Sequence, residues 1–367
     1  MNAGPTSGVT IGVEEEFHLV DQRRRLPAED AERVVAAAAA QGLEVEPELQ
    51  RSQIEVSTGV CGTLAELRAQ LVTQRRAALT AAAHAGLAVV AAGSVPAALD
   101  LDGQPYPKRR YERMVADYAE LGRQQLVCAM QTQVGVDDRE LAVAALPLVG
   151  AWLPVLIALS ASSPYFDGED TGYASYRSVL WSRWPSAGPP LAFSSAAEYD
   201  AMVDGLIASG TVTDPGMVYF DVRPSARYPT LEVRVCDAVP LLDDAVTLAG
   251  LARALVLTAL RSAAGTGPAF TPPRPELVRA ARWRAARSGL SDVLVDPRGA
   301  AALPAREVVR ALLEHVRPAL DELGDQAAVA GGVDAILRRG TSADRQRAVG
   351  DPAAALDHLV EETRAGL

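Results

Sequence analysis

The chain is poor in the residues that build common metal and redox sites, with three cysteines and four histidines among 367 residues. Cys61, Cys128 and Cys236 lie far apart and show no C-x-x-C spacing. This argues against a thiolate zinc site and a disulfide framework, and it makes the reducing cytoplasm the expected setting. The histidines form no pair with ligand spacing, and His84, which follows three alanines, is expected to be structural.

Basic residues are also in deficit: 35 lysines and arginines face 46 aspartates and glutamates, for a net charge of −11. We expect no nucleic-acid partner, because binding to a phosphate backbone needs a surplus of lysine and arginine. No G-x-G-x-x-G follows an expected strand, and the chain has neither a G-x-x-x-x-G-K-[ST] loop nor a G-x-S-x-G motif. Rossmann sites, P-loop sites and Ser-His-Asp hydrolases are therefore unsupported.

Long hydrophobic runs are scarce as well. The one uncharged apolar stretch, 141–161, reaches the roughly 20 residues that a membrane span needs, but it contains two prolines and a glycine. We expect a buried, broken helix there and no membrane association. Residues 1–8 are polar and predict no secretory signal. Without a linker or an internal repeat, residues 1–367 are expected to form a single domain that is mostly helical from about residue 241.

The segments that are present alternate between the two periodicities of secondary structure. Period-two alternation predicts strands over 9–20, 52–57, 87–92, 127–136, 218–223 and 230–236. Helical patterns cover 30–40, 63–84, 110–125, 139–160 and 195–210, and a long loop over 163–190 is a candidate cover for a site. Thr63 and Ser195, each followed three residues later by glutamate, are expected to be helix N-caps.

The polar faces of the expected strands carry the informative side chains. Glu14 and Glu16 share one face of the first strand, about 7 Å apart at about 3.3 Å per residue. Glu55 takes the polar face of the second strand, and Gln131 and Gln133 share a face of a middle strand. This set differs from an ordinary solvated face, which usually carries threonine, lysine and serine.

The last two strands add arginine to this pattern through Arg223, Glu232 and Arg234. If these strands are neighbours, several carboxylates converge with no lysine nearby, and their charge must be neutralised. Carboxylate oxygens favour a hard cation such as Mg²⁺ or Mn²⁺, and arginines beside them favour a phosphate ligand. A site for a metal-bound nucleotide is one interpretation, and the solvated face of an antiparallel sheet is the other. Glu15 falls on the apolar face and is expected to be structural.

Five different motifs follow one another along the chain in a specific order. They are Gly12-Val-Glu-Glu-Glu-Phe17, Gln53-Ile-Glu55, Tyr173-Ala-Ser-Tyr-Arg-Ser-Val-Leu-Trp181, Asp221-Val-Arg-Pro-Ser225 and Thr230-Leu-Glu-Val-Arg-Val-Cys-Asp237. Together they resemble the carboxylate–amine ligases of glutamate–cysteine ligase type 2. The resemblance implies a glutamine-synthetase-like α/β fold, with a curved, mainly antiparallel sheet and helices on its convex side. It also implies that ATP phosphorylates a carboxylate, normally that of glutamate, and that an amine such as cysteine displaces the phosphate.

The same resemblance implies roles for individual residues. The metal-binding glutamates of the family match Glu14, Glu16, Glu55 and Glu232. The expected nucleotide contacts are Gln131, Gln133, Arg223 and Arg234. Arg234 matches the arginine that faces the transferred phosphoryl group, and Arg177 matches the arginine that grips a substrate carboxylate.

Other functions stay open at this point. Gln131 and Gln133 stand where many relatives have His-x-His, which allows a specialised ligase of a secondary-metabolite pathway with an amine other than cysteine. A phosphotransferase of related fold would release ADP without an amine, and a non-catalytic descendant would only bind a nucleotide or metabolite. The ligase is favoured, because a retired site has no reason to bury uncompensated carboxylates. Glu55→Ala and Glu232→Ala are both expected to fold but not to turn over ATP. Alanine-rich helices are compatible with a homo-oligomer.

Overall fold

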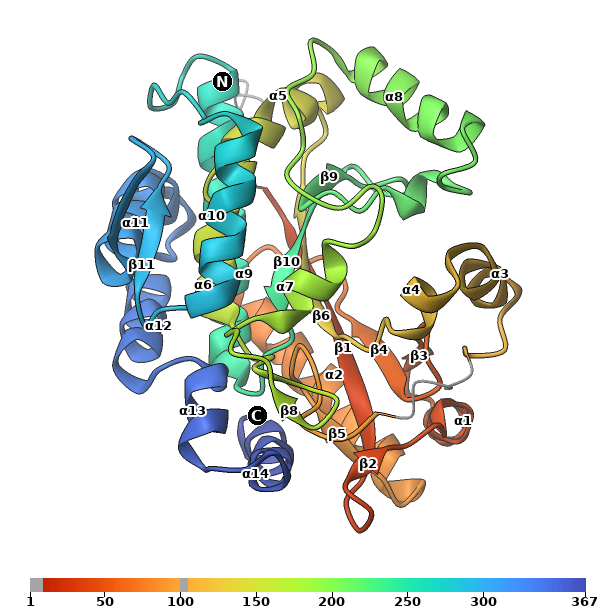
Figure 1. Cartoon of the computed structure of the whole chain (residues 1–367). Coiled ribbons are helices and arrows are strands. Elements are labelled where there is room, and N and C mark those ends of the chain that lie inside the picture. The colour runs from red at the N-terminus through yellow and green to blue at the C-terminus, as the bar shows by residue number, and fades with distance from the viewer. Residues whose placement is uncertain (1–8, 100–104) are drawn as a thin grey trace.

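The centre of the computed structural model, which describes residues 9–99 and 105–367, is an eight-stranded sheet (Figure 1). Its main path runs β3-β4-β1-β6-β10-β9, and β2 and β5 also pair with β1. The strands are β1 (Ile11–Asp21), β2 (Leu26–Pro27), β3 (Glu46–Pro47), β4 (Gln53–Ser57), β5 (Ala88–Val90), β6 (Ala129–Gly135), β9 (Val222–Pro224) and β10 (Thr230–Asp237). Every pairing in it is antiparallel, so the expected α/β fold with a mainly antiparallel sheet is confirmed.

A layer of helices covers the apolar face of this sheet. Side chains at alternate positions of β1, such as Ile11 and Val13, enter one large hydrophobic cluster with these helices. The helices that pack on the strands are α2 (Leu64–His84), α5 (Arg139–Gly150), α6 (Leu153–Ser160) and α9 (Leu242–Ala263). α1 (Ala31–Ala39) packs beside α2. α9 is buried along most of its length and is the central helix of this layer.

The expectation of a broken helix over 141–161 is confirmed. α5 and α6 meet at an angle of 60°, and every residue of α6 is buried. Pro154 lies in the first turn of α6, where a missing backbone N–H costs no helical hydrogen bond. In the part of the chain that the structure describes, α9 is the single helix long and apolar enough to cross a membrane. Most of its apolar window, 83%, is buried inside the protein.

The C-terminal region is helical apart from one hairpin that the periodicity did not indicate. Its helices are α10 (Pro275–Ser288), α11 (Ala305–Leu323), α12 (Gln326–Arg339), α13 (Ser342–Ala348) and α14 (Pro352–Ala365). The hairpin joins β11 (Val293–Asp296) to β12 (Ala301–Pro304). Asp296 fixes its turn, because its carboxylate accepts hydrogen bonds from the backbone N–H and the guanidinium of Arg298.

Several further elements connect the strands of the sheet and its helix layer. They are α3 (Arg109–Tyr118), α4 (Glu120–Arg123), β7 (Tyr165–Phe166), β8 (Glu169–Asp170), α7 (Tyr176–Trp181), α8 (Ala196–Ala208) and η1 (Pro215–Met217). In Figure 1, α7 lies in front of β10. The expected loop over 163–190 therefore contains a hairpin and a helix. The single helix expected over 110–125 is two, because Ala119 has a φ of 49° that no α-helix accommodates.

Local signals at helix starts were accurate, whereas one strand boundary was not. Thr63 and Ser195 cap α2 and α8 as expected, each accepting a hydrogen bond of 3.1 Å from a backbone N–H three residues on. The strand expected over 218–223 begins only at Val222. Met217 and Tyr219 are held instead in an aromatic cluster beside the sheet.

Glu15 has the structural role that its place on the apolar face indicated. Its carboxylate receives two hydrogen bonds from Arg75, from Nη2 at 2.6 Å and from Nε at 2.9 Å. Both side chains are at most 1% exposed. Arg75 also donates to the carbonyl oxygens of Val239 and Pro240, so this acid is fully compensated.

Candidate functional site

Strand register brings the polar side chains predicted from the sequence onto one face of the sheet. Residues directly opposite each other in antiparallel strands project to the same side. The opposed pairs are Glu16–Glu55, Glu14–Gln131, Gln133–Glu232 and Glu232–Arg223. These seven residues, with Arg234, form what we call the polar row, which crosses the sheet from β4 to β9.

The β4 end of the polar row is acidic, and the arginines nearest to it lie too far away for ion pairs. Burial is the main cause that raises the pKa values of Glu14 and Glu16, and that of Glu55 is raised well above its ordinary value. The neighbouring carboxylates add to the shift at Glu55. Among the described residues, none of these three carboxylates pairs with a lysine, arginine or histidine within 4.0 Å. Ionising this end of the row therefore opposes folding.

Glu48 joins this acidic end although the sequence did not identify it. Burial, followed by repulsion from Glu16, raises its pKa to about 7. The hydroxyl of Tyr111, from α3, donates to Glu48 Oε2 at 3.4 Å. The only sequence signal was the alternation of acids in Glu44-Val-Glu46-Pro-Glu48, a pattern that is also typical of a solvated surface.

Gln131 and Gln133 connect the acids to the other end of the row. Gln131 Nε2 donates to Glu16 Oε1 at 2.9 Å, and its Oε1 accepts from Arg234. Gln133 Nε2 donates to Glu14 Oε1 at 3.3 Å. An amide supplies both a donor and an acceptor without titrating, so each glutamine can hold a carboxylate in place over a wide pH range.

The β9 end of the polar row is a buried cluster of two arginines around one acid. Arg223 donates to Glu232 through Nε at 2.9 Å and through Nη2 at 3.3 Å, and Arg234 Nη1 donates to the same carboxylate. All three residues are at most 8% exposed. Burial lowers the pKa values of both guanidiniums. Glu232 is thus neutralised, unlike the acids at the opposite end.

Two aromatic rings lie against Arg234. Its guanidinium carbon is 5.5 Å from the ring centre of Trp181 and 5.8 Å from that of Tyr219. Contacts of this kind hold a cation by the ring's electrostatic field. Trp181 stood in a motif without an expected role, and Tyr219 had no signal, because its position depends on the loop before β9.

The side chain of Arg177 is buried and forms hydrogen bonds with the backbone of β10. Its side chain is 3% exposed. Its Nη1 donates to the carbonyl oxygen of Val235 at 3.2 Å and its Nη2 to that of Arg234 at 3.0 Å. The expectation that Arg177 grips a substrate carboxylate stays a prediction.

The donor set of the acidic end suits a hard divalent cation, because every candidate ligand is an oxygen. The pKa values of Glu14 and Glu16 are raised although Arg234 and Arg177 partly offset the effect of burial, and that of Glu55 has no such offset. Among residues 9–99 and 105–367, however, no group of three or more histidine, cysteine, aspartate or glutamate side chains is arranged as a metal cage as it stands. A cation would have to draw the acidic side chains together.

We expect Mg²⁺ or Mn²⁺ to raise the melting temperature more at pH 8 than at pH 5. The pKa of Glu48 rises from 4.5 to about 7 on folding, so its ionisation destabilises the protein increasingly as the pH passes from the lower value through the higher one. A cation at 100 times its Kd that binds only the folded chain adds about 2.7 kcal/mol. Thermal melts with and without the cation measure this, and equal shifts at the two pH values would contradict it.

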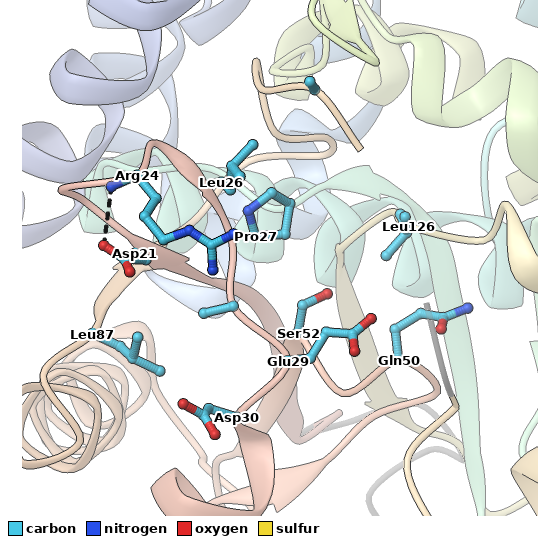
Figure 2. A pocket seen from close by; sticks show the side chains of 12 residues that line it. Asp21, Arg24, Leu26, Pro27, Glu29, Asp30, Gln50, Ser52, Leu87 and Leu126 are labelled. Atoms are coloured by element: carbon cyan, nitrogen blue, oxygen red, sulfur yellow. Dashed lines mark hydrogen bonds between the residues drawn. The ribbon is translucent and has the colours of Figure 1, made fainter. Parts of the chain in front are cut away.

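A cavity of about 370 Å³ lies near the β2 end of the sheet (Figure 2). Apolar side chains, including Leu26, Pro27 and Leu126, line it together with Gln50 and Ser52. Arg24 and Asp21 lie on one side of it, joined by a hydrogen bond from the Arg24 backbone N–H to Asp21 Oδ1 at 3.1 Å. No member of the polar row lines this cavity, so it does not define the candidate site.

The antiparallel sheet, with a helix layer on one face and the polar row on the other, agrees with the class of glutamine-synthetase-like folds that the motifs implied. Within that class the chain belongs to glutamate–cysteine ligase family 2, whose sequence profile matches residues 10–360. A Frankia alni protein provisionally named glutamate–cysteine ligase 2-2 is 46% identical over 97% of this chain and 96% of its own length. A Frankia casuarinae protein of the same provisional name is also 46% identical, but the chain spans only 39% of its length.

Solved structures support the fold. The crystal structure of glutamate–cysteine ligase from Francisella tularensis in complex with AMP superposes with a TM-score of 0.73 at 11% identity, covering 98% of this chain and 88% of that one. A bifunctional glutathione synthetase from Pasteurella multocida gives a TM-score of 0.69 at 16% identity, with 97% of this chain and 52% of that chain covered. At these identities the likeness concerns architecture alone.

Proposed function

We propose that the chain is an ATP- and Mg²⁺-dependent carboxylate–amine ligase that joins glutamate, or a similar acid, to an amine such as cysteine. The observation that carries the proposal is the division of charge along the polar row. Uncompensated carboxylates lie at one end, and two buried arginines around a single acid lie at the other. A metal-bound triphosphate complements both ends, because the cation neutralises the acids and the arginines face phosphate oxygens.

In this proposal the carboxylates of Glu14, Glu16, Glu55 and Glu232 hold Mg²⁺ or Mn²⁺, which supplies charge neutralisation for phosphoryl transfer. We add Glu48 because it lies at the acidic end with Glu14, Glu16 and Glu55. Glu232, at the other end, would have to exchange part of its pairing with Arg223 and Arg234 for the cation. Arg234 stabilises the transferred phosphoryl group. Its Nε is buried and, within the described residues, has no hydrogen-bond partner, so a phosphate oxygen would satisfy it.

The remaining residues of the row bind and orient. Arg223 and the amides of Gln131 and Gln133 would contact the nucleotide or hold the side chains that do. The phosphorylated acid has to be kept from water until the amine attacks, and the 163–190 segment, with α7 in front of β10, is the candidate cover. Gln131 and Gln133 have no titratable nitrogen, so neither of them can take up the amine proton as a histidine at the same position would.

The amine is the part of the proposal that the residues leave open. Gln131 and Gln133 use both ends of their amides inside the protein, with Gln133 Oε1 accepting from Thr230 at 2.6 Å. This arrangement favours neither a thiol nor any other side chain on the amine. A specialised ligase that uses an amine other than cysteine is therefore our second candidate.

We further propose that residues 1–367 act as one domain in the cytoplasm. A single hydrophobic cluster joins β1 and β10 to α9, α11 and α12, which supports one folding unit. All three cysteines are buried and free, which supports a reducing compartment.

A coupled assay of ADP release over pairs of acids and amines, with mass detection of the product, tests the function. A ligase releases ADP in proportion to a new amide, and only when acid and amine are both present. Release of ADP with the acid alone and a stable phosphorylated product would identify a phosphotransferase. Nucleotide binding without ADP release for any pair would identify a non-catalytic protein.

A further inference from the structure

The β10 strand contains an irregularity at Arg234. Val233 lies opposite Thr132 of β6, and Cys236 lies opposite Met130, so the two residues between them share the single position opposite Gln131. This is a β-bulge, which leaves extra backbone groups without ladder partners and redirects a side chain. Here the redirected residue is Arg234, whose Nη1 donates to Gln131 and to Glu232.

Arg177 satisfies the carbonyl oxygens of this bulge. The two groups that accept its hydrogen bonds, Arg234 O at 3.0 Å and Val235 O at 3.2 Å, belong to the two bulged residues. A guanidinium presents parallel donors on a planar fork, so it fixes two neighbouring carbonyls in one orientation. Arg177 therefore holds the backbone from which the Arg234 side chain projects.

A buried acid holds Arg177 in turn. Asp237, the last residue of β10, is fully buried, and its Oδ1 lies 3.8 Å from Arg177 Nη1. Ser175, the N-cap of α7, donates to Oδ1 at 2.9 Å, and Ser163 donates to Oδ2 at 2.7 Å. The backbone N–H of Arg177 donates to Ser163 Oγ at 3.1 Å. The start of α7 is thus tied to the strand that carries Arg234.

Close packing and hydrogen bonds hold the Asp237 carboxylate in one position. The backbone N–H of Ser162 also donates to Oδ2, at 3.0 Å. A Cβ on Gly93 would lie 2.6 Å from Asp237 Cγ and Oδ2, so the acid packs directly against that backbone. Both carboxylate oxygens have partners, and none of these partners belongs to the polar row.

We infer that Asp237 is a positioning residue, which acts through Ser175, Ser163 and Arg177 to fix the β10 bulge and the α7 helix on either side of Arg234. Trp181, at the other end of α7, supports the Arg234 guanidinium from its ring face. The inference rests on the proposed function for its effect on catalysis. It assigns to Arg177 a role in holding Arg234, in place of one in gripping a substrate.

Asp237→Asn is the test variant and Asp325→Asn is its matched control. Asparagine keeps the size of Asp237 but turns an NH₂ group towards either the Ser162 N–H or the Arg177 guanidinium. Asp325 is also a buried aspartate; it precedes α12 and pairs with Arg253 of α9, in the helix layer on the apolar side of the sheet. Loss of a buried ion pair is thus common to both variants, and only the first touches α7 and the bulge.

Hydrogen exchange measures the positioning without depending on activity. Amides of 176–181 and 234–236 are expected to exchange about tenfold faster in Asp237→Asn and unchanged in Asp325→Asn. Equal protection of both segments in the two variants would overturn the inference. If Asp237→Asn does not fold, Ser175→Ala removes the hydrogen bond to Oδ1 together with the N-cap of α7. Its readout is the exchange of 234–236, which loss of the cap alone does not change and which the inference expects to rise.

Steady-state kinetics then test the catalytic consequence. We expect kcat of Asp237→Asn to fall about 10–100-fold, with the KM values for ATP and acid changing little, because a displaced group loses its alignment rather than its substrate. Arg177→Lys should lower kcat alone, and adding it to Asp237→Asn should cost little more, since both act through one element. A raised KM for the acid with unchanged kcat would restore the substrate-gripping role and overturn the inference. A wild-type chain that turns over no pair of substrates would refute the proposed function, and the exchange result would still decide the positioning.

Discussion

Replacing Glu55 by glutamine is expected to abolish ATP turnover and at the same time to stabilise the protein near neutral pH. The half-buried carboxylate of Glu55 lies near Glu48, Glu14 and Glu16, and desolvation and their repulsion raise its pKa well above the ordinary value. A raised pKa means that the ionised form opposes folding. Glutamine removes that charge, so the metal site loses a ligand while the folded chain loses a repulsion.

The size and the pH dependence of these effects follow from the same cause. Turnover should fall by at least the roughly 10²–10³ in kcat that loss of one preorganised electrostatic group costs, because binding of the metal ion itself is weakened. A stability gain of about 1 kcal/mol would raise the melting temperature by about 2 °C. The gain should vanish below about pH 4, where the wild-type carboxylate is protonated in the folded and the unfolded states alike. ADP release and thermal melts at pH 4 and pH 8 measure both effects.

Glu15→Gln is the control for this prediction, because Glu15 is a buried acid of the adjacent strand that is paired with Arg75. Breaking that pair costs stability and should leave the turnover of the folded protein unchanged. Normal turnover in Glu55→Gln would overturn the metal assignment. A lower melting temperature of Glu55→Gln at pH 8 would contradict the claim that the ionised Glu55 carboxylate destabilises the folded chain.

Glu232→Gln is expected to lose turnover as well, but with the opposite effect on stability. Glu232 is the acid that neutralises Arg223 and Arg234, and its removal leaves two buried guanidiniums facing each other. Breaking a buried ion pair from one side costs about 3–5 kcal/mol. From the sequence, loss of Glu55 and loss of Glu232 were both expected to leave the chain folded. The structure predicts opposite effects of the two substitutions on stability.

Urea unfolding of Glu232→Gln and of Glu232→Gln/Arg223→Met measures this cost. Methionine in place of Arg223 removes one of the unpaired charges, so the double variant should recover stability and still lack turnover. Equal stability of the wild type and Glu232→Gln would show that the charge of Glu232 does not stabilise the fold through Arg223 and Arg234. Recovery of turnover in the double variant would exclude Glu232 as a metal ligand.

Several features of the site could be predicted because they depend on local periodicity. Glu14 and Glu16 share a face in any strand, and Glu15 must then face the other way, whatever the strand pairs with. The N-caps at Thr63 and Ser195 are local for the same reason, since donor and acceptor lie three residues apart. The family motifs also indicated that Arg177 and Arg234 correspond to functional arginines. They did not indicate where either side chain lies.

Other features could not be predicted because they depend on contacts between distant segments. Glu48 enters the acidic end only because β3 pairs with β4 and because Tyr111 approaches it from α3. The β10 bulge has no mark in the alternation of 230–237, since a regular strand would place Glu232 and Arg234 on one face as well. The sequence therefore could not predict that Arg177 binds the carbonyl oxygens of the bulge. It also could not predict that the two ends of the polar row differ in charge balance.

The sequence by itself determined which side chains share the polar face of each strand, because the two-residue period of a strand is a property of its own backbone. Only the tertiary structure decided which of those side chains meet. Register places Glu16 opposite Glu55 and Glu232 opposite Arg223, and it is set by pairing between segments as far apart as β1 and β4 or β6 and β10. Charge balance at each end of the row follows from that pairing, and composition alone does not contain it.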